Sequence, residues 1–282
     1  MRGSETAWAK INLALHVRRR MADGYHELET LFAFAEDGDV LSVVDAADLT
    51  LAMSGPFAAG LGGGPDNLVL RAAAALADAF GIRRGAALHL DKRLPVASGI
   101  GGGSADAAAT LRLLARHWGL DGGDGRIGAI ARALGADVPA CLASVAALGR
   151  GRGDTLTALD GDGRLDGMPL LLVNPGIALS TAVVFADWDG MDRGPVAPGD
   201  AIAAALAGRN DLEPAAIRRV PEIGGLIAHL AGCAGVTLAR MSGSGATCFA
   251  LFDTQAACDA AADSVRAAMP GYWCLATRLR TS

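Results

Sequence analysis

A glycine-rich segment between a predicted strand and a predicted helix constrains the fold more than any other part of the sequence. Four of the five residues from 99 to 103 are glycine, after strand-like residues 86–90 and before a helical pattern over 104–118. Without Cβ atoms, successive backbone N–H groups can converge on an anion, and a helix that begins there adds more N–H groups and its positive dipole end. The segment predicts a phosphate-binding loop; the alternative is a flexible connector with Ser104 as the helix N-cap.

Two common phosphate motifs do not fit this loop. It contains no lysine, which the Walker A motif requires, and Ser104 stands where the dinucleotide fingerprint needs a glycine. An anion would therefore be held by neutral backbone groups, in keeping with a formal net charge of −5. The same charge argues against nucleic-acid binding through a broad basic surface.

Composition also bounds the class and the location of the protein. With 51% hydrophobic residues, the 282-residue chain can bury a large core, which excludes wholesale disorder. The five cysteines form no C-x-x-C pair, which predicts reduced thiols in a cytoplasmic protein. We expect neither a signal peptide nor a membrane span, because no uncharged apolar run reaches about 18 residues.

Hydrophobic periodicity predicts a mixed α+β chain. Residues 8–17 alternate with a period of two, as in a strand with one buried face, and place Lys10 and Asn12 together on the other face. Further strands are predicted at 40–44, 49–53, 86–90, 145–148, 170–173, 236–241, 247–252 and 273–279. Further helices are predicted at 68–80, 126–134, 200–206, 221–230 and 254–269.

The glycine- and aspartate-rich run 160–163 predicts the division between two domains, residues 1–158 and 159–282. Residues 187–199 contain Asp, Gly and Pro and are predicted to form an exposed connection.

Two further segments carry candidate functional residues. Met241–Ala246 is a second glycine cluster between two predicted strands, and taken alone it indicates only a hairpin. Gly135–Cys141 places Asp137 in a turn that Pro139 stiffens. Asp137 either caps the next helix or holds a carboxylate on rigid backbone near the phosphate loop.

Three of these segments, in this order, resemble the kinase superfamily named for galactokinase, homoserine kinase, mevalonate kinase and phosphomevalonate kinase. The matching residues are Ala9–Asn12 with its lysine, Pro95–Ser104 and Ser242–Gly245. The resemblance implies a small-molecule kinase that uses ATP. It also implies a two-domain fold, with an N-terminal ATP-binding lobe like the second domain of ribosomal protein S5 and a ferredoxin-like C-terminal lobe.

Within the superfamily, residues 22–32, 135–139 and 210–213 resemble the kinases that act on a cytidine-diphosphate-linked methylerythritol. The likeness spans residues 7 to 252 and implies phosphorylation of the 2-hydroxyl of that compound, in the non-mevalonate pathway to isoprenoid precursors. Trp8, Ala105 and Asp154 depart from the family pattern.

The resemblance implies a role for each matching residue. Asp137 matches the catalytic carboxylate and Lys10 the lysine that pairs with it; an ammonium keeps a carboxylate ionised and stabilises the transferring phosphoryl charge. The matching ATP-binding residues are Pro95, Val96, Ala97, Ser98, Gly99, Ile100, Gly101, Gly102, Gly103, Ser104 and Ala105. The matching substrate-binding residues are Asn12, Tyr25, His26, Thr181, Phe185, Gly243 and Ser244. Mg²⁺ is expected with the ATP to neutralise phosphoryl charge, and no protein ligand is assigned to it.

Pattern alone allows plainer interpretations of these residues and two other functions. Lys10 would be a surface lysine, Tyr25 a hairpin aromatic and Phe185 a core residue. The other functions are a sister kinase for a mevalonate-, homoserine- or sugar-type substrate, and an S5-like RNA-binding module. Aromatic rings at 25 and 185 favour a substrate with a base to stack on, and so the cytidine compound. We expect a monomer or a homodimer.

Overall fold

The computed structural model describes residues 3–159 and 165–280, and the chain divides into two compact units. Unit 1 contains the residues up to Ala9, Asp37–Val96 and Gly101–Ser144; unit 2 contains Lys10–Glu36, Ala97–Ile100 and the residues from Val145 on. The predicted division at 160–163 lies outside the described residues, so domains 1–158 and 159–282 stay a prediction.

Two long strands contribute to both units. They are β1 (Gly3–Arg20) and β2 (His26–Ala46), which pair with each other. β1 extends the predicted strand 8–17 in both directions. The change of unit within each strand means that neighbouring residues, such as Ala9 and Lys10, are assigned to different units.

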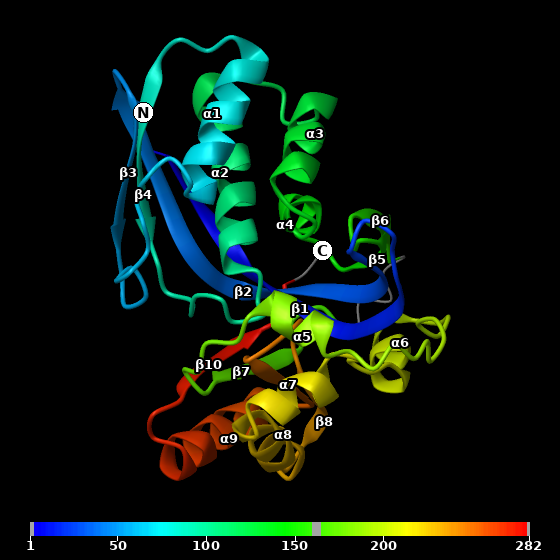
Figure 1. The fold of residues 1–282 in the computed structure, drawn as a ribbon. Coiled ribbons are helices and arrows are strands. Elements are labelled where there is room, and N and C mark those ends of the chain that lie inside the picture. The colour runs from blue at the N-terminus through cyan, green and yellow to red at the C-terminus, as the bar shows by residue number, and fades with distance from the viewer. Residues whose placement is uncertain (1–2, 160–164, 281–282) are drawn as a thin grey trace. The chain divides into compact units, whose positions relative to one another are not determined.

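Unit 1 combines a sheet with helices that lie along one of its faces (Figure 1). β4 (Gly85–Asp91) pairs antiparallel with β2, where Val40 lies opposite Asp91, and parallel with β3 (Leu49–Ser54). The helices are α1 (Leu68–Phe80), α2 (Gly102–Trp118), α3 (Gly125–Leu134) and α4 (Val138–Ala143). α1 and α2 contact each other, and both helices bury several alanines.

The bounds of α1 follow from its end signals. The Asn67 side chain accepts a hydrogen bond from the backbone N–H of Val69, which satisfies one donor of the first turn. The helix ends where Gly81 adopts φ +66°, a left-handed conformation that favours glycine. The predicted helix 68–80 is therefore confirmed residue for residue.

Unit 2 contains an antiparallel four-stranded sheet in the order β10-β7-β9-β8. Its strands are β7 (Pro169–Asn174), β8 (Val236–Met241), β9 (Cys248–Phe252) and β10 (Trp273–Arg278). The two inner strands, β7 and β9, are buried along their whole length, as expected for strands with neighbours on both sides and covered faces.

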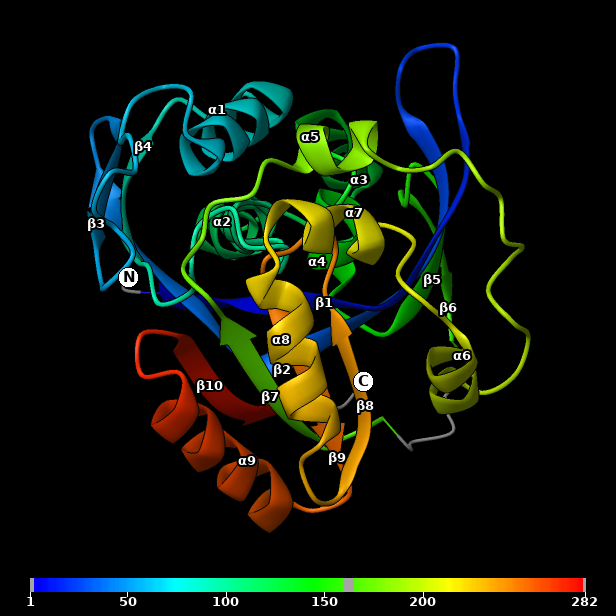
Figure 2. The same ribbon diagram turned by 60° about the horizontal axis from the view of Figure 1, so that its bottom comes forward.

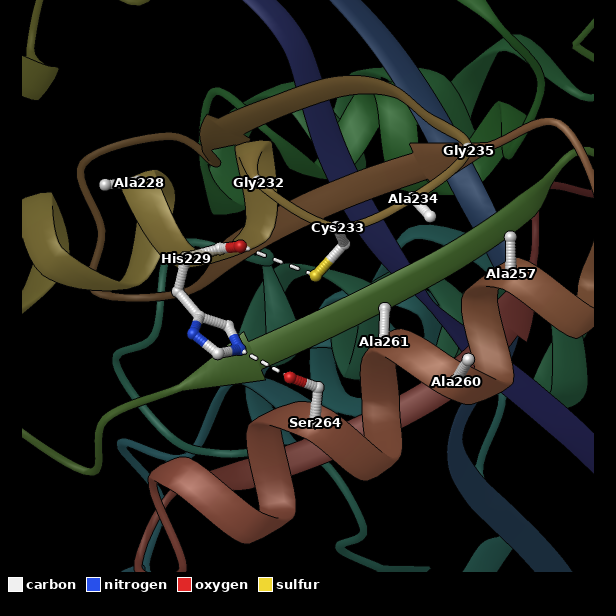
Figure 3. Close-up of a pocket in the computed structure, with 10 residues that line it drawn as sticks. All are labelled: Ala228, His229, Gly232, Cys233, Ala234, Gly235, Ala257, Ala260, Ala261 and Ser264. Carbon is white, nitrogen blue, oxygen red and sulfur yellow. Dashed lines mark hydrogen bonds between the residues drawn. The ribbon is translucent and has the colours of Figure 1, made fainter.

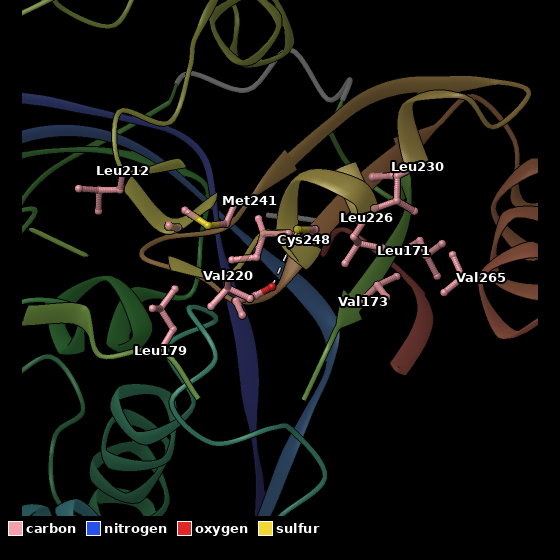
Figure 4. Packing of buried hydrophobic residues seen from close by; sticks show 14 of the residues in the cluster. Leu171, Val173, Leu179, Leu212, Val220, Leu226, Leu230, Met241, Cys248 and Val265 are labelled. Carbon is pink, nitrogen blue, oxygen red and sulfur yellow. Dashed lines mark hydrogen bonds between the residues drawn. The ribbon is translucent and has the colours of Figure 1, made fainter. Parts of the chain in front are cut away.

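Two helices complete a ferredoxin-like arrangement in this unit. α8 (Glu222–Ala231) and α9 (Gln255–Ala268) lie across one face of the sheet (Figure 2). When the three short helices between β7 and α8 are set aside, the elements in chain order are β7, α8, β8, β9, α9 and β10, which is the βαββαβ pattern. α8 buries residues at a spacing of three and four, and these side chains meet the sheet in the core shown in Figure 4. The predicted ferredoxin-like C-terminal part is confirmed.

The remaining elements of unit 2 are short. They are β5 (Ala147–Gly151), β6 (Thr155–Ala158), α5 (Thr181–Ala186), α6 (Ala201–Ala207) and α7 (Glu213–Arg219). β5 pairs antiparallel with residues 28–32 of β2. Periodicity does not predict α4, α5 or α7, which have six or seven residues, although it does predict the seven-residue α6, one position early, at 200–206. No helix in the described residues is long and apolar enough to cross a membrane.

Leu226→Ala should lower the free energy of unfolding by about 3 kcal/mol, because this α8 side chain is fully buried and its truncation leaves a cavity. Leu206→Ala is the matched control: Leu206 is 47% exposed, and its truncation should cost about 0.5 kcal/mol or less. Urea unfolding measures both values. Similar losses for the two variants would contradict the described core.

Candidate active site

The predicted phosphate loop joins β4 to α2, as the sequence analysis expects. α2 begins at Gly102, two residues earlier than predicted, and its N-cap is Gly101 with φ +66°. No side chain caps this helix, so Ser104 is not the N-cap and the connector alternative loses its main support. A helix of 17 residues thus begins with two glycines and no acidic residue in its first turn. This is the pattern expected of a helix start that receives an anion.

Within unit 2, the first part of this loop interlocks with the second glycine cluster. The Ser242 hydroxyl donates to the carbonyl oxygen of Gly99 at 3.0 Å, and the N–H of Thr247 donates to the carbonyl oxygen of Ser98 at 3.0 Å. A Cβ on Gly99, whose φ is +80°, would overlap the carbonyl oxygen of Ser242 and lie 2.8 Å from that of Gly245. The two clusters therefore lie against each other, and Met241–Ala246 is more than a hairpin.

Lys10 and Asn12 lie beside this interlock. The backbone N–H of Lys10 donates to the carbonyl oxygen of Ile100 at 3.0 Å, and its ammonium donates to Asn12 Oδ1 at 2.7 Å. Asn12 Nδ2 in turn donates to Thr30 Oγ1 at 2.7 Å, and the backbone N–H of Asn12 donates to Ser242 Oγ at 3.2 Å. Lys10, Asn12 and Ser242 are thereby joined in one hydrogen-bonded network.

The prediction that Lys10 and Asn12 face away from the core is wrong. Only 3% and 2% of their surfaces are exposed, and the Lys10 ammonium lies 5.6 Å from the centre of the Phe32 ring. Burial of an ammonium is costly unless polar partners replace water, and Asn12 Oδ1 supplies one such partner here. A surface-lysine interpretation of Lys10 is thereby excluded.

The segment 210–213 holds the second glycine cluster and β1 in place. Asn210 Nδ2 donates to the carbonyl oxygens of Met241 and Gly243, both at 2.8 Å. Asp211 Oδ2 accepts the backbone N–H of Val17 at 2.8 Å. In the sequence these residues are only part of a family pattern, and their hydrogen bonds give that pattern a physical reason.

Asp137 belongs to unit 1 and stands at the N-cap position of α4. Its side chain makes no capping hydrogen bond, so the capping alternative is not what the structure shows. Its carbonyl oxygen accepts the N–H of Cys141 at 3.0 Å, and Pro139 within the first turn stiffens the backbone. The pairing of Asp137 with Lys10, which is in unit 2, stays a prediction.

An aromatic cluster in unit 2 contains two of the predicted substrate residues. The rings of His26 and Phe185 lie 5.0 Å apart between centroids, and Trp188 meets His26 edge-on at 5.7 Å. Burial, with a smaller effect of Arg20, lowers the pKa of His26, so the imidazole is neutral near pH 7. A neutral imidazole both donates and accepts a hydrogen bond, as the edge of a pyrimidine requires.

Two other predicted substrate residues, Tyr25 and Thr181, are placed differently. Tyr25 is 55% exposed at the β1–β2 hairpin, where the Arg152 guanidinium lies 4.1 Å from the centre of its ring. Thr181, at the start of α5, shares a 2.8 Å hydrogen bond between its hydroxyl and that of Ser244. Thr181 is thus connected to the interlocked loops.

Trp188 is a residue that the sequence analysis missed. It follows Phe185 by three positions, a spacing that places both side chains on one side of a helical turn. The signal was present, but Trp188 falls in the stretch 187–199 predicted as a mere connection.

A pocket elsewhere in unit 2 contains none of the predicted residues. It lies between α8 and α9 and is lined mainly by alanines and glycines (Figure 3). His229 Nε2 and Ser264 Oγ lie 3.1 Å apart across it, and the Cys233 thiol donates to the carbonyl oxygen of His229 at 3.4 Å. Burial raises the pKa of Cys233, which works against a reactive thiolate. Among the described residues, no group of three or more His, Cys, Asp or Glu side chains could hold a metal ion.

Family models and curated relatives match this chain. The N-terminal domain of the GHMP kinases matches residues 67–144, and their C-terminal domain matches residues 198–271. The chain is 56% identical to the 4-diphosphocytidyl-2-C-methyl-D-erythritol kinase of Rhizorhabdus wittichii, with 99% of this chain and 96% of the relative covered. It is 52% identical to the enzyme of the same name from Sphingopyxis alaskensis, with 98% of each covered.

Solved structures give the same result. A crystal structure of 4-(cytidine 5'-diphospho)-2C-methyl-D-erythritol kinase matches with a TM-score of 0.84 at 35% identity, covering 99% of this chain and all of that one. Homoserine kinase from Cytophaga hutchinsonii matches with a TM-score of 0.75 at 15% identity, covering 99% and 95%, and so shows only a shared fold.

Gly99→Ala should lower the free energy of unfolding by about 3 kcal/mol, because the new Cβ combines left-handed backbone strain with overlap of the second glycine cluster. Gly81→Ala is the control: its φ is +66°, but a Cβ there meets nothing within 4 Å, so the loss should be about 1 kcal/mol. Chemical unfolding compares the two. Equal losses would show that the two glycine clusters do not touch.

Proposed function

Because this chain belongs to the GHMP kinases and, within them, to the 4-diphosphocytidyl-2-C-methyl-D-erythritol kinases, we propose that it transfers a phosphoryl group from ATP to the 2-hydroxyl of 4-(cytidine 5'-diphospho)-2-C-methyl-D-erythritol. The reaction would serve the non-mevalonate route to isoprenoid precursors. The observation that carries the proposal is the interlock of two glycine clusters beside the buried ammonium of Lys10. A cytoplasmic location and a monomer or homodimer belong to the same proposal.

ATP is proposed to bind along residues 95–105. Backbone N–H groups of the loop and of the first turn of α2 would donate to phosphate oxygens, and the helix dipole favours negative charge at that end. Mg²⁺ bound to the phosphates would neutralise part of the charge that moves with the phosphoryl group. We assign it no protein ligand.

Asp137 is proposed to accept the proton of the attacking hydroxyl. A secondary hydroxyl is a poor nucleophile, and a carboxylate held at the start of α4 can remove its proton as the new bond forms. Lys10 is proposed to stabilise the charge on the transferring phosphoryl group. Its ammonium is held by Asn12, so it need not reorganise when that charge develops.

The cytidine group is proposed to bind at the aromatic cluster. Phe185 offers a ring face for stacking, His26 offers a donor and an acceptor, and Tyr25 would cover the base from the hairpin. Asn12, Thr181, Gly243 and Ser244 would contact the diphosphate or the sugar alcohol. This clustering favours a substrate with a base over mevalonate, homoserine or a sugar. The net charge of −5 argues against an RNA-binding module.

A coupled assay tests the proposal directly. Purified protein, ATP and Mg²⁺ should consume ATP only when the cytidine-diphosphate compound is added, and a phosphate on its 2-hydroxyl should be visible by ³¹P NMR. Turnover of mevalonate or homoserine with the cytidine compound untouched would overturn the substrate assignment. RNA binding without ATP turnover would overturn the enzyme assignment.

Asp137→Asn should lower kcat by about 10³-fold while ATP still binds, because the amide cannot accept the proton and the ATP loop is unchanged. Steady-state kinetics and calorimetric titration of ATP measure the two effects. Asp124→Asn is the matched control, since Asp124 is an N-cap of α3 in the same unit and asparagine caps equally well. Near wild-type kcat in Asp137→Asn would remove Asp137 from the mechanism.

Tyr25→Ala should raise KM for the cytidine compound about tenfold and leave KM for ATP nearly unchanged, because only the substrate would lose a stacking partner. Tyr25→Phe keeps the ring and should behave like wild type. Parallel increases in both KM values would place Tyr25 in the scaffold and not in the cytidine pocket.

A further inference from the structure

Unit 1 buries three charged side chains that none of the motifs singles out. Lys92 directly follows β4, Asp39 lies on β2, and Asp106 is the fifth residue of α2. The Lys92 ammonium donates to Asp106 Oδ2 at 2.8 Å and also forms an ion pair with Asp39. All three side chains are almost fully withdrawn from solvent.

Two carboxylates and one ammonium leave this cluster with an excess of acid. Burial raises the pKa of Asp106 to about 7, an effect that the Lys92 ammonium opposes and the Asp39 carboxylate reinforces. Asp106 Oδ1 has no hydrogen-bond partner among the described residues. Burial lowers the pKa of Lys92, but Asp106 and Asp39 outweigh burial and raise it, so the lysine stays charged. A buried ion pair of this kind need not add stability over apolar residues of similar volume, so the cluster can serve to position the backbone.

The cluster connects both ends of the phosphate loop. At the first end, Asp39 Oδ1 accepts the backbone N–H groups of Arg93 and Leu94, at 2.6 and 2.8 Å, directly before Pro95. At the other end, the ammonium binds Asp106 of α2. It also lies 3.0 Å from where a Cβ on Gly102 would be, so glycine at the start of the helix leaves room for Lys92.

We infer that Lys92 is a positioning residue for ATP: by binding Asp39 and Asp106 together, its side chain fixes the first turn of α2 relative to the residues that lead into the phosphate loop. The inference rests on the proposed function, since it assumes that this turn binds ATP phosphates. The position of Lys92 beside the start of α2 explains why two carboxylates, and not one, surround its ammonium. A lone ammonium beside the positive end of a helix dipole would be unfavourable, and Asp39 and Asp106 offset it.

The test compares two substitutions at Asp106, with ATP affinity measured by calorimetric titration without any acceptor substrate. Asp106→Asn keeps an oxygen that accepts from Lys92 and should leave the Kd for ATP within threefold of wild type. Asp106→Leu has a similar volume but no acceptor, and should raise that Kd at least tenfold. Lys92→Met removes the shared donor and should have the same effect as Asp106→Leu.

Glu5→Gln is the structural control, because Glu5 forms an ion pair with Arg112 in the same unit away from the loop. It should lower Tm and leave ATP affinity unchanged. If Asp106→Leu also lowers only Tm, the cluster is structural and the inference is overturned; should Lys92→Met fail to fold, the Asp106 pair alone decides. Because these titrations need no acceptor, wild-type ATP binding without phosphorylation of the cytidine compound would overturn the proposed function and leave this test intact.

Discussion

The close backbone approach of two glycine clusters determines where the other residues of the site lie. Gly99 and the segment 242–245 lie so close together that a Cβ on Gly99 would overlap the backbone of that segment. Lys10 is tied to the next residue of the loop by its N–H, and Thr181 is tied to Ser244. Segments far apart in the chain are thus tied to the contact between the two glycine clusters. A small displacement of that contact would move a reacting group by a similar amount.

Each unit also buries a lysine, and both lysines are held by neighbours that replace water. In unit 2, the Lys10 ammonium donates to the neutral amide oxygen of Asn12. In unit 1, Asp39 and Asp106 surround Lys92 with an excess of negative charge. Because a buried ammonium is costly without such partners, the groups around each lysine hold it in a fixed position.

The sequence predicts what local chemistry determines. End signals gave α1 its bounds, and consecutive glycines marked the loop before α2. Burial of Lys10 was not predictable, because alternation reports which residues are apolar and not whether a second layer covers the polar face. The sequence does not predict the Lys92 cluster, because Asp39 and Asp106 lie 53 and 14 positions away from Lys92 in the chain and no motif links them. Trp188 was not predicted, because it lies in a stretch whose composition indicates a loop, although it follows Phe185 at a helical spacing of three.

An acidic chain that binds polyphosphates must solve an electrostatic problem locally. With a net charge of −5, the average field repels ATP, but exposed charges beyond about 8–10 Å are screened at physiological ionic strength. The groups near the phosphates therefore decide. In the proposed site those groups would be the backbone N–H donors of the glycine loop and of the helix start, neither of which needs a basic surface. Glycine supplies this affinity without adding positive charge elsewhere, which explains how selective phosphate binding can coexist with an acidic sequence.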